Sequence, residues 1–125
     1  MNRVTLGDQY GTWPCAVRFE DKPLTVSHIC RLPGTIPEAK LNWMSLSLHD
    51  FNRSVRFGRF TLHSEKRTIF FRYTYRIMPV IPLHLQFDEA MRTIHYEMKT
   101  LGRLIIMVME KTSKQIESAA LDFEI

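Results

Sequence analysis

The stretch that decides the fold reads VRFGRFTL (residues 55–62), HSEKR (63–67) and TIFFRYTYRIM (68–78). The outer two segments alternate apolar and polar residues with the two-residue period of a β-strand. The polar segment between them is typical of a turn. One face of the second strand would carry the apolar series Ile69, Phe71, Tyr73, Tyr75 and Ile77. The sequence therefore predicts a β-hairpin with one face in a hydrophobic core.

Gly58 lies where the alternation of the first strand changes phase. Val55 and Phe57 share one parity, whereas Phe60 and Leu62 share the other. A bulge at the glycine would return both pairs to the same face, since glycine is common at bulges. We therefore expect Phe57 and Phe60 to be buried together beneath the helices.

Three shorter extended segments precede the hairpin. They are Arg3 to Leu6, Trp13 to Phe19 and Leu24 to Leu32. Side chains alternate along a strand, so one face of the third segment would carry Val26, His28, Cys30 and Leu32. His28 is expected to be a hydrogen-bonded residue at the edge of the core and not a ligand.

Two amphipathic helices complete the pattern. The first begins at Pro37-Glu38, since proline and an acid suit a first helical turn, and it ends near Asn52, which tolerates a left-handed conformation. A long second helix begins at Phe87 or Asp88, after two prolines that interrupt the chain. Its apolar seam steps by three and four residues: Phe87, Met91, Ile94, Met98, Leu101, Ile105 and Val108.

The order β-β-β-α-β-β-α predicts an α+β domain. It would be an antiparallel sheet of five strands with helices packed on one face. A chain of 125 residues has the size of a single domain. No apolar run approaches the roughly 20 residues of a membrane-spanning helix, and the first residues lack the apolar core of a signal peptide. We expect Cys15 and Cys30 to be reduced core thiols and the location to be cytoplasmic.

Positive charge is concentrated on the hairpin. Residues 53–76 hold seven basic residues and one acid, which leaves 10 basic and 12 acidic residues in the rest of the chain. Such a region could attract nucleic acid, an anionic membrane surface or an acidic protein segment, or it could be a solvated sheet face. The candidate partner-binding residues are Arg56, Arg59, Arg72 and Arg76.

The end of the long helix is apolar nearly all round from Leu104 to Met109. A helix covered on two sides needs that breadth, whereas a surface helix does not. The alternatives are a homodimer interface and a fully internal helix end. Ile106, Met107 and Met109 are the candidate interface residues.

Several of these elements together resemble the YbjN family, bacterial domains labelled as sensory-transduction regulators. The likeness is found in Leu32-Pro33, Ile36 to Lys40, Asn52, Phe57 to Phe60 and Ile69 to Tyr75, and it spans about residues 12–110. The fold of that family is similar to that of the class I chaperones of type III secretion. The resemblance implies a small protein-binding domain, often dimeric, without an active site.

The chain departs from the family pattern in two places. Members usually begin with an additional helix, and here the first strand comes too early to leave room for one. Either the chain is truncated, or a partner or the C-terminal tail covers the corresponding surface. The turn Ser64 to Arg67 also lacks the acidic and glycine residues expected there.

No catalytic constellation is recognisable. The five histidines show no metal-ligand spacing, the five glycines form no phosphate-binding loop, and no serine or cysteine has the context of a nucleophile. We predict no enzyme activity, no cofactor and no metal. The leading hypothesis is a chaperone-like or regulatory protein-interaction domain that binds another polypeptide and acts as a homodimer. The alternative is a nucleic-acid-binding module that uses residues 53–76, because Arg56 to Phe60 echoes an RNA-binding strand.

Overall fold

The computed structural model describes residues 2–8, 11–21 and 24–124, with side chains described for 13–21, 24–112 and Lys114. The strands are Asn2–Asp8 (β1), Gly11–Asp21 (β2), Leu24–Arg31 (β3), Arg59–His63 (β4) and Thr68–Arg76 (β5). The helices are Leu41–Asn52 (α1), Leu83–Glu97 (α2) and Arg103–Glu124 (α3). A 3-10 turn, Glu38–Lys40 (η1), precedes α1, and a π-helical turn, Met98–Gly102 (η2), joins α2 to α3.

The strands pair in the order β1-β2-β3-β5-β4, and every pair is antiparallel. The chain therefore leaves the sheet after β3, forms α1, and returns as the β4–β5 hairpin alongside β3. One cross-strand row runs Cys15, Cys30, Phe71 and Phe60 over four neighbouring strands. The predicted α+β class and the antiparallel pairing are confirmed.

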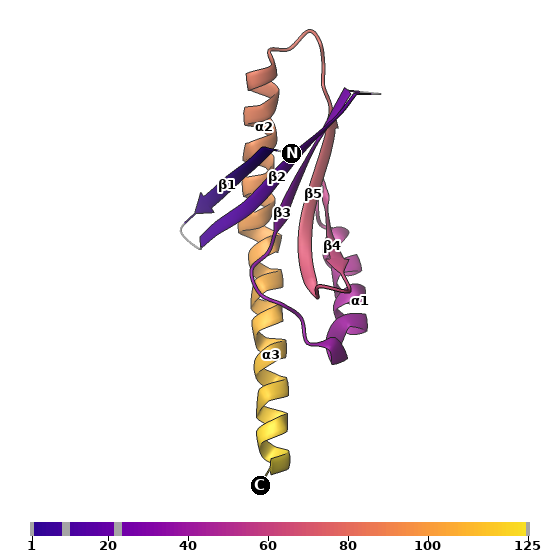
Figure 1. The fold of residues 1–125 in the computed structure, drawn as a ribbon, viewed down its shortest axis with the longest axis vertical. Helices are drawn as coiled ribbons and strands as arrows, with labels where there is room; N and C mark the ends of the chain where they lie inside the picture. Colours follow the sequence, from indigo (N-terminus) through magenta and orange to yellow (C-terminus); the bar gives the residue numbers. More distant parts are fainter. Residues whose placement is uncertain (1, 9–10, 22–23, 125) are drawn as a thin grey trace.

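The core lies between one face of the sheet and the helices (Figure 1). Its sheet side consists of Trp13, Cys15, Cys30, Phe60, Ile69 and Phe71, and its helix side of Met44, Leu48, Ile94, Met98, Ile105 and Met109. Because α1 and the long α2–α3 segment share this face, none of the described helices packs on the opposite face of the sheet. The candidate site lies on this uncovered face of the sheet.

The long helix begins at Leu83, four residues before the predicted start. Pro82 precedes it, and its carbonyl oxygen accepts hydrogen bonds from the amides of Leu85 and Gln86. Proline before a helix costs no hydrogen bond, because the first turn of a helix has unpaired N–H groups. The predicted seam is buried at Ile94, Met98 and Ile105, and partly buried at its other four positions.

The prediction for Phe57 is wrong. Phe60 is buried, but the Phe57 side chain is 54% exposed. The strand begins only at Arg59, so no bulge carries the earlier residues into the pleat. Gly58 instead turns the chain with a φ of +85°, in the region that favours glycine. Phe57 then makes an edge contact with Tyr73, 6.2 Å between ring centroids.

The prediction of two reduced thiols is also wrong, although both cysteines are buried as expected. Cys15 and Cys30 form a disulfide between β2 and β3. The register places the two residues directly opposite each other, with Cα atoms 4.1 Å apart. Sequence separation gives no sign of this proximity, because it depends on where the β2–β3 turn falls.

His28 is hydrogen-bonded as predicted, but it lies fully inside the core and not at its edge. Its Nε2 lies 3.0 Å from the hydroxyl oxygen of Tyr75, and its ring packs against Phe87. Burial lowers the pKa of His28. Burial, and then the neighbouring Tyr73, raise the pKa of Tyr75 to about 12, so this pair is neutral at neutral pH.

Candidate interaction site

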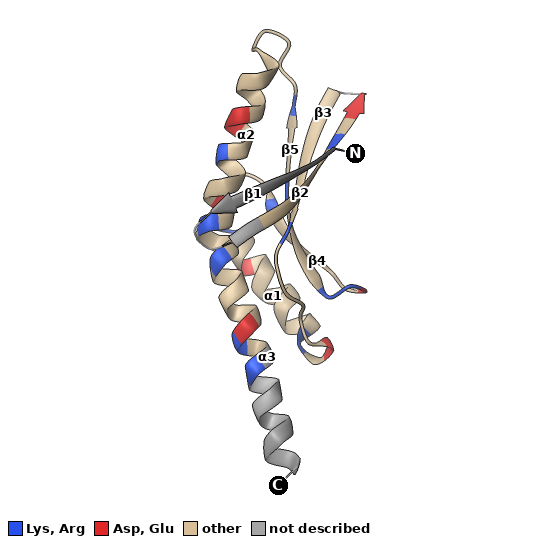
Figure 2. Ribbon diagram, turned by 60° about the vertical axis from the view of Figure 1, so that its left-hand side comes forward, with Lys and Arg blue, Asp and Glu red and all other residues tan. Residues whose placement is uncertain are grey.

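The face of the sheet opposite the core is strongly basic. Its exposed arginines come from four strands: Arg18, Arg31, Arg59, Arg72 and Arg76. The alternation of side chains along each strand puts these residues on the side away from the buried row. Basic positions on β3, β4 and β5 can be followed in Figure 2. We call these five residues and the strand surface between them the basic face.

Cross-strand register brings the arginines close to one another. Arg59 on β4 lies directly opposite Arg72 on β5, and Arg72 lies opposite Ile29 on β3. Arg31 lies opposite Phe70, and Arg76 lies opposite Thr25. Side chains directly opposite in an antiparallel pair have Cβ atoms about 5 Å apart. Arg59 and Arg72 therefore form a close pair, Arg31 is diagonal to Arg72, and Arg18 and Arg76 lie farther along the same face.

Few acids neutralise the cluster. Among the described residues, ion pairs join Arg18 to Glu20, at 3.5 Å, and Arg92 to Glu89, at 4.0 Å. Within that part of the chain, Arg59 and Arg72 therefore have no acidic partner. Like charges placed opposite each other on a sheet are destabilising. A ligand with negative charge would remove this repulsion.

The structure brings together three of the four predicted partner-binding residues. Arg59, Arg72 and Arg76 lie on the basic face, but Arg56 does not. Arg56 precedes β4, and its amide nitrogen donates a hydrogen bond to Oε1 of Glu97 at 3.3 Å, on the helix side of the sheet. The reason is the same late start of β4 that exposes Phe57.

Sequence reasoning missed Arg18 and Arg31. They lie outside the hairpin, on β2 and β3, and join the cluster only because β3 pairs with β5. The available signal was strand parity, since each alternates with buried residues of its own strand. The pairing of β3 with β5 was the missing information.

The predicted interface residues on α3 do not share one environment. Met107 is 51% exposed, Ile106 is partly buried and Met109 is 2% exposed. Met109 belongs to the core, which contradicts its place in a surface interface. Leu104, 49% exposed, lies one helical turn from Met107 and was not predicted.

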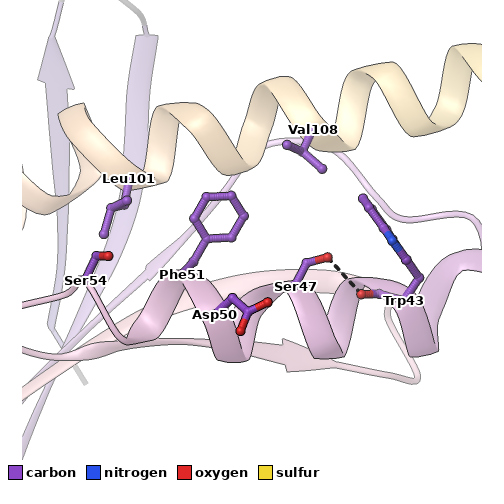
Figure 3. A pocket seen from close by; sticks show the side chains of 7 residues that line it. All are labelled: Trp43, Ser47, Asp50, Phe51, Ser54, Leu101 and Val108. Atoms are coloured by element: carbon purple, nitrogen blue, oxygen red, sulfur yellow. Dashed lines mark hydrogen bonds between the residues drawn. The ribbon is translucent and has the colours of Figure 1, made fainter.

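An apolar pocket of about 450 Å³ lies between α1 and α3 (Figure 3). Trp43 and Phe51 project from α1 toward Leu101 and Val108 on the long helix. Trp43 is 48% exposed, so the mouth of the pocket is apolar as well. The lining contains no basic residue, which separates this pocket chemically from the basic face.

Asn52 has a role that its predicted place at a helix end did not reveal. Its Nδ2 donates a hydrogen bond to the carbonyl oxygen of Phe60 at 2.8 Å, and its Oδ1 accepts one from the Phe60 amide at 2.7 Å. Phe60 lies on β4, which is an edge strand of the sheet. The side-chain amide thus pairs with the strand edge as another strand would.

Among the residues with described positions, no three metal-ligand side chains are close enough to hold a metal ion. The helices of the same part of the chain include none with the length and apolar character to cross a membrane. A scan against protein-family models, a search of curated proteins and a search of solved structures each found no match to this chain.

Proposed function

We propose that this protein is a non-enzymatic interaction domain that binds an acidic segment of another polypeptide on its basic face. The observation that supports the proposal best is the pair Arg59 and Arg72, directly opposite each other and without an acidic partner among the described residues. Arginine forms two parallel hydrogen bonds to a carboxylate, so neighbouring arginines suit a run of Asp or Glu side chains.

The resemblance to the YbjN family and to the class I secretion chaperones belongs to this proposal. Those chaperones bind polypeptide segments, and the present fold also offers a sheet surface that none of the described helices covers. Edge-strand pairing is less suited to the partner, because Asn52 already occupies the outer hydrogen-bonding groups of Phe60. The side chains of the basic face would therefore supply most of the contact.

Nucleic acid is the alternative ligand for the same arginines. Single-stranded nucleic acid is usually bound by exposed aromatic rings in addition to basic residues. Phe60 is buried, Phe57 lies away from the basic face, and Phe70 is partly buried between Arg31 and Thr61. Phe70 is thus the described phenylalanine that offers a ring on the basic face, and a single partly buried ring is a small stacking surface, which favours an acidic polypeptide.

A direct test is the binding of a fluorescent oligo-glutamate peptide and of a single-stranded oligonucleotide of equal charge. We expect the peptide to bind at low salt and R59A/R72A to weaken binding about tenfold or more. The matched control is R56A/R92A, which removes two arginines from the helix side. Equal weakening by the control, or no peptide binding at low salt, would refute the proposal. Binding of the oligonucleotide alone would favour the alternative.

The proposal includes a homodimer formed through the exposed side of α3. Leu104 and Met107 are about half exposed there, and Trp43 lies at the mouth of the neighbouring pocket. Light scattering after size exclusion should give the mass of a dimer, and Met107→Glu should give a monomer. A monomeric wild-type protein would remove the dimer from the proposal.

The cytoplasmic location predicted from the sequence also remains a prediction. The disulfide stands against it, because cytosolic thiols are kept reduced in most organisms. Alkylation of free thiols before cell lysis decides the question: labelled Cys15 and Cys30 would support a cytoplasmic location, and unlabelled cysteines would refute it.

A further inference from the structure

One end of the molecule is formed by an apolar loop between β5 and α2. Figure 1 shows this loop beyond the start of α2, at the top of the view. The sequence from Ile77 to Leu85 contains no Asp, Glu, Lys or Arg. The exposed fractions of its large side chains are Met78 48%, Val80 86%, Ile81 43%, Leu83 56% and Leu85 49%. We call residues 77–85 the apolar tip.

The neighbouring hairpin adds to this surface. Phe19 at the end of β2 is 52% exposed, and Leu24 at the start of β3 is 46% exposed. The carbonyl oxygen of Leu24 accepts a hydrogen bond from the Ile77 amide at 3.0 Å, which holds the hairpin beside the tip. Single exposed apolar residues need no explanation, but a contiguous set marks an interaction site.

The tip is held in one conformation by Gln86. Its Oε1 accepts a hydrogen bond from the Met78 amide, and its Nε2 donates to the carbonyl oxygens of Met78 and Ile81, each at 2.8 Å. The Ile81 amide also donates to the Met78 carbonyl oxygen at 3.2 Å. Two further positions, Pro79 and Pro82, have no N–H to satisfy. The apolar side chains are thus presented by an ordered loop.

We propose that the apolar tip inserts into the surface of an anionic lipid bilayer. A backbone segment can enter hydrocarbon only if its N–H and C=O groups are hydrogen-bonded within the protein. In the tip, Gln86 bonds several of these groups, and the two prolines have no N–H to satisfy. Such internal pairing is unnecessary for a loop that remains in water. Since no described helix is long and apolar enough to cross a bilayer, the contact would be peripheral.

Arg76 is the charged residue that would favour an anionic over a neutral bilayer. Arg76 is exposed three residues before Pro79, at the end of the basic face nearest the tip. Arg72 lies two repeats farther along the same face of β5, about 13 Å away. Of the described acids near the tip, Glu20 is paired with Arg18, and Asp21 and Asp88 are exposed. Insertion of the tip would bring Arg76 within about one Debye length of the lipid phosphates. At that distance salt does not fully screen the attraction between them.

The test is co-sedimentation of the full chain with vesicles of phosphatidylcholine, with and without phosphatidylglycerol. We expect the wild-type protein to bind the anionic vesicles and the Val80→Asp variant to bind them about tenfold more weakly. Arg76→Gln should weaken binding to anionic vesicles only. Val80 is 86% exposed, so the fold should not change; the matched control is Leu46→Asp, on α1 at 72% exposure.

Three results would overturn the inference. The first is a wild-type protein that stays in the supernatant with both kinds of vesicle. The second is a Leu46→Asp variant that binds as weakly as Val80→Asp. The third is a Val80→Asp variant that sediments normally but loses an oligomer seen by light scattering, because the tip would then contact a second copy of the chain. Binding to the oligo-glutamate peptide is measured separately, so either proposal can fail alone.

Discussion

Replacing Asn52 by alanine removes a side-chain contact that closes the edge of β4. Two hydrogen bonds of 2.7 and 2.8 Å join its amide to the backbone of Phe60. Each such bond contributes about 1 kcal/mol net, and the Phe60 N–H and C=O would be left without these partners in a partly buried place. We therefore expect Asn52→Ala to lower the free energy of unfolding by about 2–3 kcal/mol.

The assay is equilibrium denaturation followed by circular dichroism. In a domain of this size such a loss corresponds to a fall in Tm of roughly 8–12 °C. Ser47→Ala is the matched control, because the Ser47 hydroxyl also donates a hydrogen bond, to the Trp43 carbonyl oxygen at 3.0 Å, but at an exposed place. Its effect should be within about 0.5 kcal/mol.

The Asn52→Asp variant tests the two hydrogen bonds to Phe60 separately. Its carboxylate can still accept the hydrogen bond from the Phe60 amide, but it cannot donate to the Phe60 carbonyl oxygen, which it would repel. The aspartate variant should therefore be destabilised as well. The reasoning is refuted if Asn52→Ala costs no more than Ser47→Ala, since the edge would then be satisfied equally well by water.

Three further predictions concern stability. Reduction of the Cys15–Cys30 disulfide, which spans 15 residues, should cost about 3 kcal/mol in denaturant titrations with and without reductant; an unchanged midpoint would contradict this. Burial lowers the pKa of His28 from 6.5, so the unfolded chain binds the proton first and the free energy of unfolding should fall as pH drops below about 6.5. The His28→Phe variant should show a flatter pH dependence of stability. Parallel stability profiles for the variant and the wild type would contradict this. Gly58→Ala puts a Cβ 2.6 Å from a backbone oxygen at a φ of +85°, and should cost about 2 kcal/mol or more, whereas Gly102→Ala, with its nearest contact at 3.4 Å, should change stability by less than about 1 kcal/mol.

The periodic parts of the fold could be predicted because their signal is local. The alternation of Ile69, Phe71 and Tyr73 places the buried face of β5 correctly, and the spacing of Ile94, Met98 and Ile105 does the same for the long helix. In each case one face of one element must be buried, and the period of the backbone alone selects the residues.

Register and strand neighbours could not be predicted in this way. A glycine at a phase change suits a bulge and a left-handed turn before the strand equally well, so Gly58 did not decide the place of Phe57. The Cys15–Cys30 disulfide depends on the β2–β3 register, and the gathering of Arg31 with Arg72 depends on the pairing of β3 with β5. The first depends on the exact residues of the β2–β3 turn and the second on strands far apart in the chain, and neither follows from the period of a single element.

The charge of the open sheet face is difficult to explain by stability. Exposed ion pairs contribute little, and here even those are few: of the five arginines, Arg18 alone has an acidic partner among the described residues. Two like charges about 6 Å apart in water repel by about 0.7 kcal/mol before salt screening, so the opposed Arg59 and Arg72 lower the stability of the hairpin. Lysine or threonine at either position would keep the strand soluble, and threonine would remove the repulsion. A cluster that costs stability in the free protein and can regain it from an anion is typical of a binding surface, and this reasoning points to the basic face before any other part of the molecule.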